Sequence, residues 1–307
     1  MDAWSSTMAN RAVILGCGYI GLELGDQLQT AGIDVVGVRR SADGCRAIED
    51  RGFTAVQADL TDCADLAELP DADWLVFAAS SGGREADAAR KIYVDALSDV
   101  IEEYGAREPT PDRLVYTSST GVYGDHDGDW VDESTPLEPT TDKTRVLAEA
   151  ERVARETSAA YGIDGTVARF SGLYGPDRYR LERYLSGPVT EGYLNMVHRV
   201  DAAGAVGYLL TADLARDDAV VVTDDEPVDK WAFADWLADQ CDVPAPPKQT
   251  KNERLSDDGL SAAARRRILT SKRCSNARLR ELGYEFQYPT FKTGYRAAIE
   301  AYRATTP

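Results

Sequence analysis

Short apolar runs alternate with amphipathic segments through the first half of the chain. Apolar runs of about four to eight residues indicate buried strands, and apolar positions recurring every three or four residues indicate helices. The predicted strands are Arg11–Leu15, Ile33–Val38, Phe53–Gln57, Trp74–Ala78, Leu114–Thr117 and Gly165–Phe170. The predicted helices are Tyr19–Ala31, 42–51, about 84–104 and Thr141–Tyr161. This alternation predicts an α/β fold with a doubly wound parallel sheet covered by helices on both faces.

A glycine-rich turn, Gly16-Cys17-Gly18-Tyr19-Ile20-Gly21, follows the first predicted strand and opens the first predicted helix. In that context the spacing GxGxxG predicts a Rossmann-type fold that binds a dinucleotide. Gly16 permits the tight turn, Gly18 lets the backbone approach a pyrophosphate, and Gly21 lets the helix pack against the strand. The helix start at Tyr19 and Ile20 offers unpaired N–H groups to the phosphates.

The residues at the end of the second predicted strand indicate which nicotinamide cofactor is bound. NAD-binding folds place an acidic residue there, about 20 residues after the glycines, to hold the ribose 2′-hydroxyl. This chain has Arg39, Arg40 and Ser41 instead, and its first carboxylate is Asp43. Because arginine forms paired hydrogen bonds with phosphate, we expect NADP, with its 2′-phosphate, rather than NAD. The alternative is a solvated arginine pair at a strand end.

Two further strand ends supply candidate cofactor contacts. Asp59 and Leu60 follow the third predicted strand, where the carboxylate would reach the adenine or cap the next helix. Ala78 and Ala79 close the fourth predicted strand, and their small side chains leave room for a cofactor.

The regularity falls after about residue 171, so we expect two unequal parts. Residues 1–10 are predicted to be a disordered tail, and 11–170 an NADP-binding Rossmann domain. Residues 171–307 are predicted to form a smaller C-terminal α/β lobe that binds the substrate. A helix and strand within 201–222 are expected to return to the first domain.

The formal net charge of −18 over 307 residues excludes general binding to nucleic acid or to anionic membranes. No apolar run approaches the roughly 20 residues of a membrane-spanning helix, and the N-terminus lacks the basic region of a signal peptide. We therefore expect a cytoplasmic protein. Aspartate supplies 33 of the 52 acidic residues and lysine only 7 of the 34 basic ones, which is typical of halophilic proteins. Five cysteines without CxxC spacing and two histidines predict reduced thiols and no metal site.

Four stretches together resemble the extended short-chain dehydrogenase/reductases, the group of nucleotide-sugar epimerases and dehydratases. They are Tyr116–Gly124 (YTSSTGVYG), Arg169–Pro176 (RFSGLYGP), Val197–Asp201 (VHRVD) and Asn276–Tyr284 (NARLRELGY). With the glycine motif, the resemblance runs from about residue 11 to 301. It implies a nicotinamide cofactor and a small-molecule substrate such as a nucleotide sugar. The family often forms homodimers through two long helices, here about 84–104 and 141–161.

The resemblance also implies a catalytic hydroxyl and a YxxxK pair, in which tyrosine moves a proton and lysine lowers its pKa. Ser119 matches the hydroxyl. At the YxxxK positions this chain has Thr141 and Arg145. A threonine hydroxyl is too weak an acid to replace a phenol near neutral pH, and Arg145 retains its proton while still able to bond the cofactor ribose.

The proton donor must therefore be another group. Tyr123 and His126 rank first because they lie on the loop expected to face the substrate, and the other candidates are Tyr116, Tyr174 and Asp142. The Asp-Glu pair that serves elimination in the 4,6-dehydratases follows their active-site threonine, and this chain has Thr120 and Gly121 after Ser119, so that reaction is disfavoured.

Arg178, Arg180 and Arg183 follow the YGP segment and are candidates for binding an anionic substrate, with pairing to surface acids as the alternative. Two functions remain open. The first is an NADP-dependent oxidoreductase or epimerase acting on a sugar nucleotide or related hydroxyl or carbonyl compound. The second is a non-catalytic NADP-binding protein with a redox-sensing or regulatory role.

Overall fold

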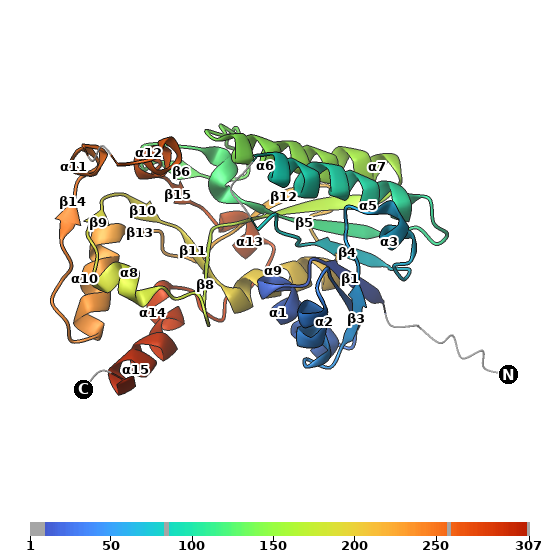
Figure 1. Cartoon of the computed structure of the whole chain (residues 1–307), viewed down its shortest axis with the longest axis horizontal. Helices are drawn as coiled ribbons and strands as arrows, with labels where there is room; N and C mark the ends of the chain where they lie inside the picture. The colour runs from blue at the N-terminus through green and yellow to red at the C-terminus, as the bar shows by residue number, and fades with distance from the viewer. Residues whose placement is uncertain (1–9, 83–85, 257–258, 306–307) are drawn as a thin grey trace. The chain divides into compact units, whose positions relative to one another are not determined.

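A computed structural model describes residues 10–82, 86–256 and 259–305, so the predicted tail lies almost wholly outside the described residues. Seven strands form one sheet in the order β12-β7-β5-β4-β1-β2-β3 (Figure 1). The pairings from β3 through β2, β1 and β4 to β5 are parallel. The strand order reverses beside β1, so the predicted doubly wound sheet is confirmed. The strands are β1 (Arg11–Leu15), β2 (Asp34–Arg39), β3 (Thr54–Gln57), β4 (Trp74–Phe77), β5 (Arg113–Ser119), β7 (Asp164–Phe170) and β12 (Ala219–Val222).

Two compact units make up the chain. The first comprises residues 1–117, 149–167 and 206–219, and the second comprises 118–148, 168–205 and 220–307. The sequence analysis placed residues 118–148 in the Rossmann domain, but they belong to the second unit. Residues 206–219 belong to the first unit.

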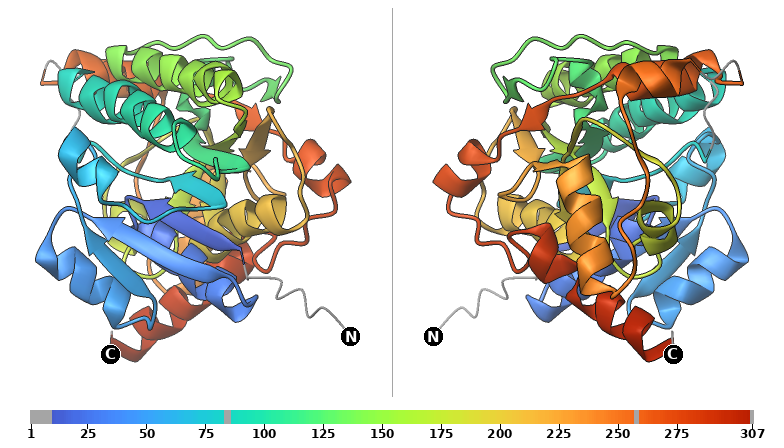
Figure 2. Two further views of the ribbon diagram at one scale, coloured as in Figure 1. Left: turned by 90° about the vertical axis from the view of Figure 1, so that its right-hand side faces the viewer. Right: turned by 90° about the vertical axis from the view of Figure 1, so that its left-hand side faces the viewer.

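In the first unit, α1 (Tyr19–Thr30) and α2 (Ala42–Glu49) lie on the opposite face of the sheet from α5 (Ala96–Gly105) and α7 (Ser158–Ala160) (Figures 1 and 2). The strands between them are buried because helices cover both faces, as their continuous apolar sequences require. The remaining helices here are α3 (Cys63–Ala67), α4 (Ala86–Arg90) and parts of α6 (Asp142–Arg152) and α9 (Arg199–Thr211).

The two long predicted helices are not continuous α-helices. A π-helical turn at Lys91–Asp95 separates α4 from α5, and another at Val153–Thr157 separates α6 from α7. Residues 84 and 85 of the first prediction lie outside the described residues. Because a π turn adds a residue without changing the apolar periodicity much, the sequence pattern does not reveal it.

The second unit has an aromatic core of its own. Tyr174 stacks on Tyr295 with ring centroids 4.9 Å apart, and Phe233 packs edge-on against Phe291 at 5.3 Å. Around this core lie short paired strands, β8 with β11, β9 with β14, β10 with β13 and β6 with β15. Their bounds are β6 (Trp130–Val131), β8 (Gly172–Tyr174), β9 (Val189–Thr190), β10 (Tyr193–Leu194), β11 (Met196–His198), β13 (Val228–Asp229), β14 (Lys248–Gln249) and β15 (Arg273–Cys274). The helices are α8 (Leu181–Leu185), α10 (Lys230–Gln240), α11 (Lys251–Leu255), α12 (Ala262–Leu269), α13 (Ala277–Glu281), α14 (Phe291–Gly294) and α15 (Arg296–Thr305).

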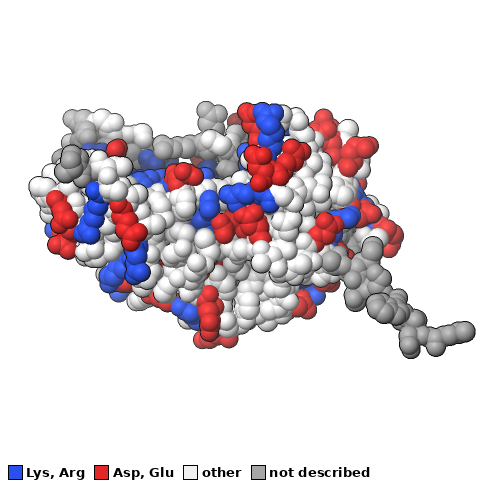
Figure 3. Space-filling view, turned by 90° about the horizontal axis from the view of Figure 1, so that it is seen from below, with Lys and Arg blue, Asp and Glu red and all other residues white. Residues whose placement is uncertain are grey.

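Basic and acidic side chains are interspersed on the face drawn in Figure 3. Many are paired: in the first unit Arg216 contacts the carboxylates of Asp112, Asp164 and Asp213. Within the described residues, no helix is long and apolar enough to cross a membrane.

One buried acid in the second unit makes stability depend on pH. Asp224 is 1% exposed, and burial raises the pKa of its carboxyl well above the usual range. A raised folded-state pKa contributes stability below the unfolded-state pKa of about 4, and that contribution is lost as pH rises through the folded value.

We therefore expect the free energy of unfolding to decline with rising pH above about 4, and Asp224→Asn to remove that part of the decline. Urea unfolding across pH measures this. Asp225→Asn is the control, because the hydrogen bonds from Arg280 and Asn276 outweigh burial and lower the pKa of Asp225. Identical pH profiles for wild type and Asp224→Asn would contradict the assignment.

Candidate functional site

The glycine turn brings together the ends of three strands in the first unit. Gly16 has φ +86°, and a Cβ there would lie 2.3 Å from the Cα of Ala79, at the end of β4. The N–H groups of Gly16 and Cys17 donate to the carbonyl of Val38 in β2, at 3.2 and 3.0 Å. Only glycine fits at position 16, because any side chain would collide with the β4 backbone.

Arg39 lies against the same turn. Its Nη1 donates to the carbonyl of Cys17 at 3.2 Å, and a Cβ on Gly18 would lie 2.9 Å from that nitrogen. Gly18 precedes α1 without any side-chain cap. Tyr19 is half-buried and Ile20 is buried. A Cβ on Gly21 would lie 2.9 Å from a methyl of Ile14, so Gly21 lets α1 pack against β1.

The other candidate cofactor residues of the first unit have mixed roles. Ser41 caps α2 by accepting the N–H of Gly44 at 3.2 Å, whereas Arg40 is exposed. Asp59 accepts the N–H and O–H of Thr61 at 3.0 and 2.9 Å, and the backbone bond is the main cause of its lowered pKa. The remaining two positions are Leu60, which is buried, and Ala78, whose N–H donates to Leu15 at 2.8 Å.

Side chains at positions 16 and 18 would collide with β4 and with Arg39, so this turn requires glycines there. The first unit therefore fits a dinucleotide. Gly16 allows the turn to approach the backbone of β4, Gly18 allows it to approach the guanidinium of Arg39, and that guanidinium supplies positive charge at the edge of the turn.

A group of hydroxyls lies in the second unit. Ser119 ends β5 and caps the short 3-10 helix Thr120–Tyr123, its Oγ accepting the N–H of Gly121 at 3.1 Å. A Cβ on Gly121 would lie 3.4 Å from both Ser119 Oγ and Thr144 Cγ2, so these two residues flank the glycine. Thr144 in turn contacts Thr141 through their hydroxyls at 3.0 Å. Thr141 and Thr144 are thus paired through their hydroxyls, while the methyl group of Thr144 lies toward Gly121.

Thr141 and Arg145 occupy the YxxxK positions, but Thr141 caps a helix and Arg145 forms an ion pair with Asp142. Thr141 Oγ1 accepts the N–H of Thr144 at 3.1 Å, and Thr144 Oγ1 accepts the N–H of Thr141 at 3.0 Å, a reciprocal cap at the start of α6. The Arg145 side chain is 59% exposed and pairs with Asp142 one turn earlier. Neither residue supplies a weakly acidic proton at this position.

Tyr123 differs from the expectation that it faces the substrate. It is fully buried, and its hydroxyl accepts a hydrogen bond from Arg169 at 2.8 Å. Burial raises the pKa of the phenol, despite the neighbouring guanidinium. Tyr123 ends the 3-10 helix Thr120–Tyr123, in which Thr120 and Val122 are also buried. His126 remains half-buried, with Nε2 2.9 Å from the carbonyl of Tyr123.

Two residues near this loop had no sequence signal. Thr144 forms the hydroxyl pair with Thr141 described above. Lys272 is 7% exposed and donates to the carbonyl of Gly124 at 2.8 Å, and burial lowers the pKa of its ammonium. A contact spanning 148 residues along the chain cannot be read from local sequence pattern.

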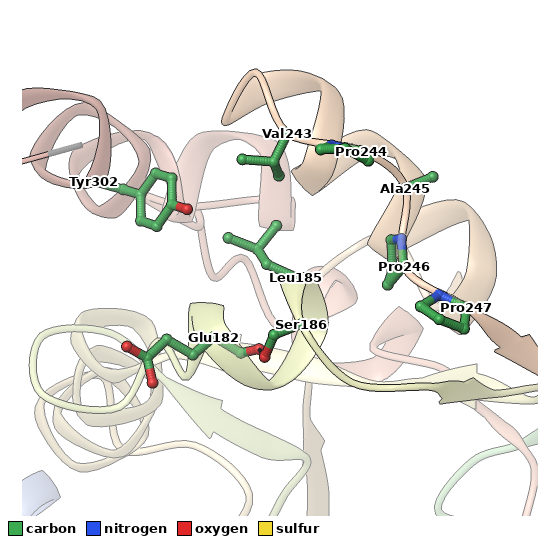
Figure 4. A pocket seen from close by; sticks show the side chains of 9 residues that line it. All are labelled: Glu182, Leu185, Ser186, Val243, Pro244, Ala245, Pro246, Pro247 and Tyr302. Carbon is green, nitrogen blue, oxygen red and sulfur yellow. Dashed lines mark hydrogen bonds between the residues drawn. The ribbon is translucent and has the colours of Figure 1, made fainter. Parts of the chain in front are cut away.

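The three candidate substrate arginines lie after β8. Arg178, Arg180 and Arg183 are all exposed, and Arg180 has a left-handed backbone (φ 55°) just before α8. None of them lines the pocket of about 430 Å³ in Figure 4. That pocket is bordered by apolar and proline side chains and one carboxylate, Glu182, so its chemistry does not suit an anion. Its lining is Glu182, Leu185, Ser186, Val243, Pro244, Ala245, Pro246, Pro247 and Tyr302.

Comparison with known proteins decides the family. The model of the NAD dependent epimerase/dehydratase family matches residues 12–223, more than half of the chain. The chain belongs to this family. The resemblance drawn from the four sequence stretches and the glycine motif is therefore confirmed, and so is the nicotinamide-cofactor class of the fold.

Individual relatives cover nearly the whole chain. Protein YeeZ of Escherichia coli K12 is 30% identical over 290 residues, which are 91% of this chain and 96% of YeeZ. A structure from Methylobacillus flagellatus, provisionally described as an NAD-dependent epimerase/dehydratase, is 30% identical with a TM-score of 0.74, covering 96% of this chain and all of that one (100%). The UDP-glucose 4-epimerase of Thermotoga maritima, solved with UDP-glucose, has a TM-score of 0.78 over 96% of this chain and 99% of its own. At 17% identity, that last match shows the shared fold alone.

Proposed function

We propose that this protein is an NADP-dependent oxidoreductase or epimerase that acts on a sugar nucleotide or a related hydroxyl or carbonyl compound. Its proton donor is a group other than the usual tyrosine. The nicotinamide, when bound, would supply or accept the hydride. The observation that carries the cofactor choice is the position of Arg39 against Gly18, where a 2′-phosphate gains a guanidinium partner.

Two further features support the choice of NADP over NAD. The strand end has Arg39, Arg40 and Ser41 where an NAD site needs a carboxylate. The first acid beyond them, Asp43, pairs with Arg46 on the exposed side of α2, and its side chain is 86% exposed.

The position of Ser119 at the end of β5 supports a catalytic role for its hydroxyl. Its Oγ accepts the Gly121 N–H and keeps its own proton to donate toward a substrate oxygen. Of the two candidate groups on this loop, His126 is half-buried whereas Tyr123 is fully buried, so we propose His126 rather than Tyr123 as the group that moves the proton.

Ser119→Ala should lower turnover at least a hundredfold, because it removes the hydroxyl that would orient the reacting oxygen. NADPH affinity should change little. The measurement is nicotinamide absorbance with a panel of nucleotide sugars, together with NADPH titration. Ser261→Ala is the matched control: Ser261 caps α12 by accepting the Ala264 N–H at 3.2 Å, so it reports the loss of a cap alone.

Because Thr141 caps α6 and Arg145 pairs with Asp142, the usual acid/base pair is absent, and this favours a second function without catalysis. If the protein binds NADP without turnover, as a redox-sensing or regulatory module, wild type will show neither an absorbance change nor an epimer with any sugar nucleotide. Wild-type turnover that survives in Ser119→Ala would contradict the catalytic role proposed for Ser119.

The proposal also includes the cellular location and the oligomeric state of the protein. The net charge of −18 and the excess of aspartate support a cytoplasm of high salt content as its location. The family resemblance supports a homodimer formed through the two long helices predicted at about 84–104 and 141–161.

A further inference from the structure

The pocket of about 430 Å³ in the second unit is lined by residues other than those assigned above to the cofactor and the reaction (Figure 4). Its walls come from three segments: α8, the stretch 243–247 after α10, and α15. Leu185, Val243 and Tyr302 line it from these segments, and each is only partly buried where it packs on the aromatic core. Small-molecule sites usually have volumes of about 300–1,000 Å³. The pocket is therefore large enough for a small ligand.

One wall of the pocket, residues 243–247 (VPAPP), is fixed at both ends. The N–H of Val243 donates to the carbonyl of Ala238 at 3.0 Å. The carbonyl of Pro247 accepts the N–H of Val189 at 2.8 Å. Because proline has a fixed φ and no N–H group, this wall is stiff and presents few unpaired donors to an apolar ligand. A preformed wall lowers the cost of ordering the site when a ligand binds.

The charge of the pocket is negative. Within the described residues, Glu182 is the one charged side chain of the lining, and its carboxylate forms no ion pair. The hydroxyl of Ser186 donates to the carbonyl of Glu182 at 2.6 Å, so its remaining capacity is to accept a hydrogen bond. Arg303, which follows Tyr302 in α15, is paired with Asp242 at 3.6 Å. The lining thus favours a ligand that brings a positive charge and donors.

The pocket has a polar end and an apolar end. In Figure 4, Glu182 and Tyr302 lie toward one end and Pro247 toward the other, with Leu185 and Val243 between them. A carboxylate accepts charge-assisted hydrogen bonds from a protonated amine, and the face of a tyrosine ring attracts the same group. The apolar side chains suit the hydrocarbon part of such a ligand.

We propose that this pocket binds a small molecule that has an apolar body and one protonated amine. The ammonium group lies at Glu182, and the apolar body lies against Leu185 and Val243. An anionic compound of the same shape is repelled by the carboxylate, so the charge gives the site its selectivity. This ligand differs from the sugar nucleotide of the proposed function, and its binding does not depend on that function.

Titration of the full chain with phenethylamine at pH 7, followed by saturation-transfer NMR, tests the proposal. We expect a Kd of about 1 mM or tighter, with phenethyl alcohol binding about fivefold more weakly and hydrocinnamate more weakly still. Glu182→Gln should weaken binding of the amine about fivefold and leave binding of the alcohol unchanged, because it removes only the charge. Glu300→Gln is the matched control, since Glu300 is an exposed glutamate of α15 that does not line the pocket.

Val243→Ala tests the apolar contact separately. It should weaken the amine and the alcohol by the same factor, about threefold, because both lose the same hydrocarbon contact. Circular dichroism establishes that each variant is folded. The proposal is overturned if wild type binds none of the three compounds at about 10 mM, or if it binds hydrocinnamate as tightly as the amine. It is also overturned if folded Glu182→Gln and Val243→Ala both keep the wild-type affinity for the amine.

Discussion

Gly16→Ala should lower the free energy of unfolding by about 3 kcal/mol and abolish dinucleotide binding. A left-handed backbone costs a residue with a Cβ roughly 1–2 kcal/mol, and overpacking against a fixed backbone adds roughly 1–3 kcal/mol. Both apply here, because φ is +86° and the added Cβ would lie 2.3 Å from the Cα of Ala79. Relieving that collision requires β1 and β4 to separate at the turn where the pyrophosphate is expected.

Urea unfolding and NADPH titration measure the two effects. Gly32→Ala is the matched control: Gly32 has φ +83°, and nothing lies within 4 Å of the position of its Cβ. It therefore carries the backbone strain without the collision, and should cost about 1 kcal/mol with unchanged NADPH binding. Equal destabilisation by the two variants would show that the approach of Ala79 to Gly16 is unimportant.

Arg39→Asp should reverse the preference between the two nicotinamide cofactors. We expect NADPH affinity to fall about a hundredfold, because a charge-assisted partner of the 2′-phosphate is replaced by a repelling carboxylate. NADH affinity should rise, since aspartate at this strand end can accept the ribose 2′-hydroxyl.

Fluorescence titration with both cofactors gives the ratio of affinities. Arg46→Ala is the control, because Arg46 is an exposed arginine of α2 that pairs with Asp43 and does not contact the glycine turn. An unchanged ratio in Arg39→Asp would mean that Arg39 only braces the turn through its bond to Cys17.

The sheet could be predicted from sequence because its strands are continuous apolar runs between turn signals. β1 matches its predicted bounds, and β2 and β3 each begin one residue later than predicted. The glycine motif could also be recognised locally, since its function depends on backbone conformation at consecutive residues.

Other features depend on residues far apart in the chain, so local pattern could not supply them. Tyr123 lies on the expected loop, yet its hydroxyl meets Arg169, a residue 46 positions away, and the ring is drawn into the core. The π-helical turns at 91–95 and 153–157 also escape prediction, because a single inserted residue barely disturbs the helical period.

The central claim is that the glycine turn and Arg39 form an NADP site. The most direct test is titration of the purified wild-type protein, in high potassium chloride, with NADPH and with NADH, followed by nicotinamide fluorescence. The account predicts that NADPH binds at least about tenfold more tightly than NADH, the effect of one charge-assisted contact. Tighter binding of NADH, or binding of neither cofactor, would contradict it.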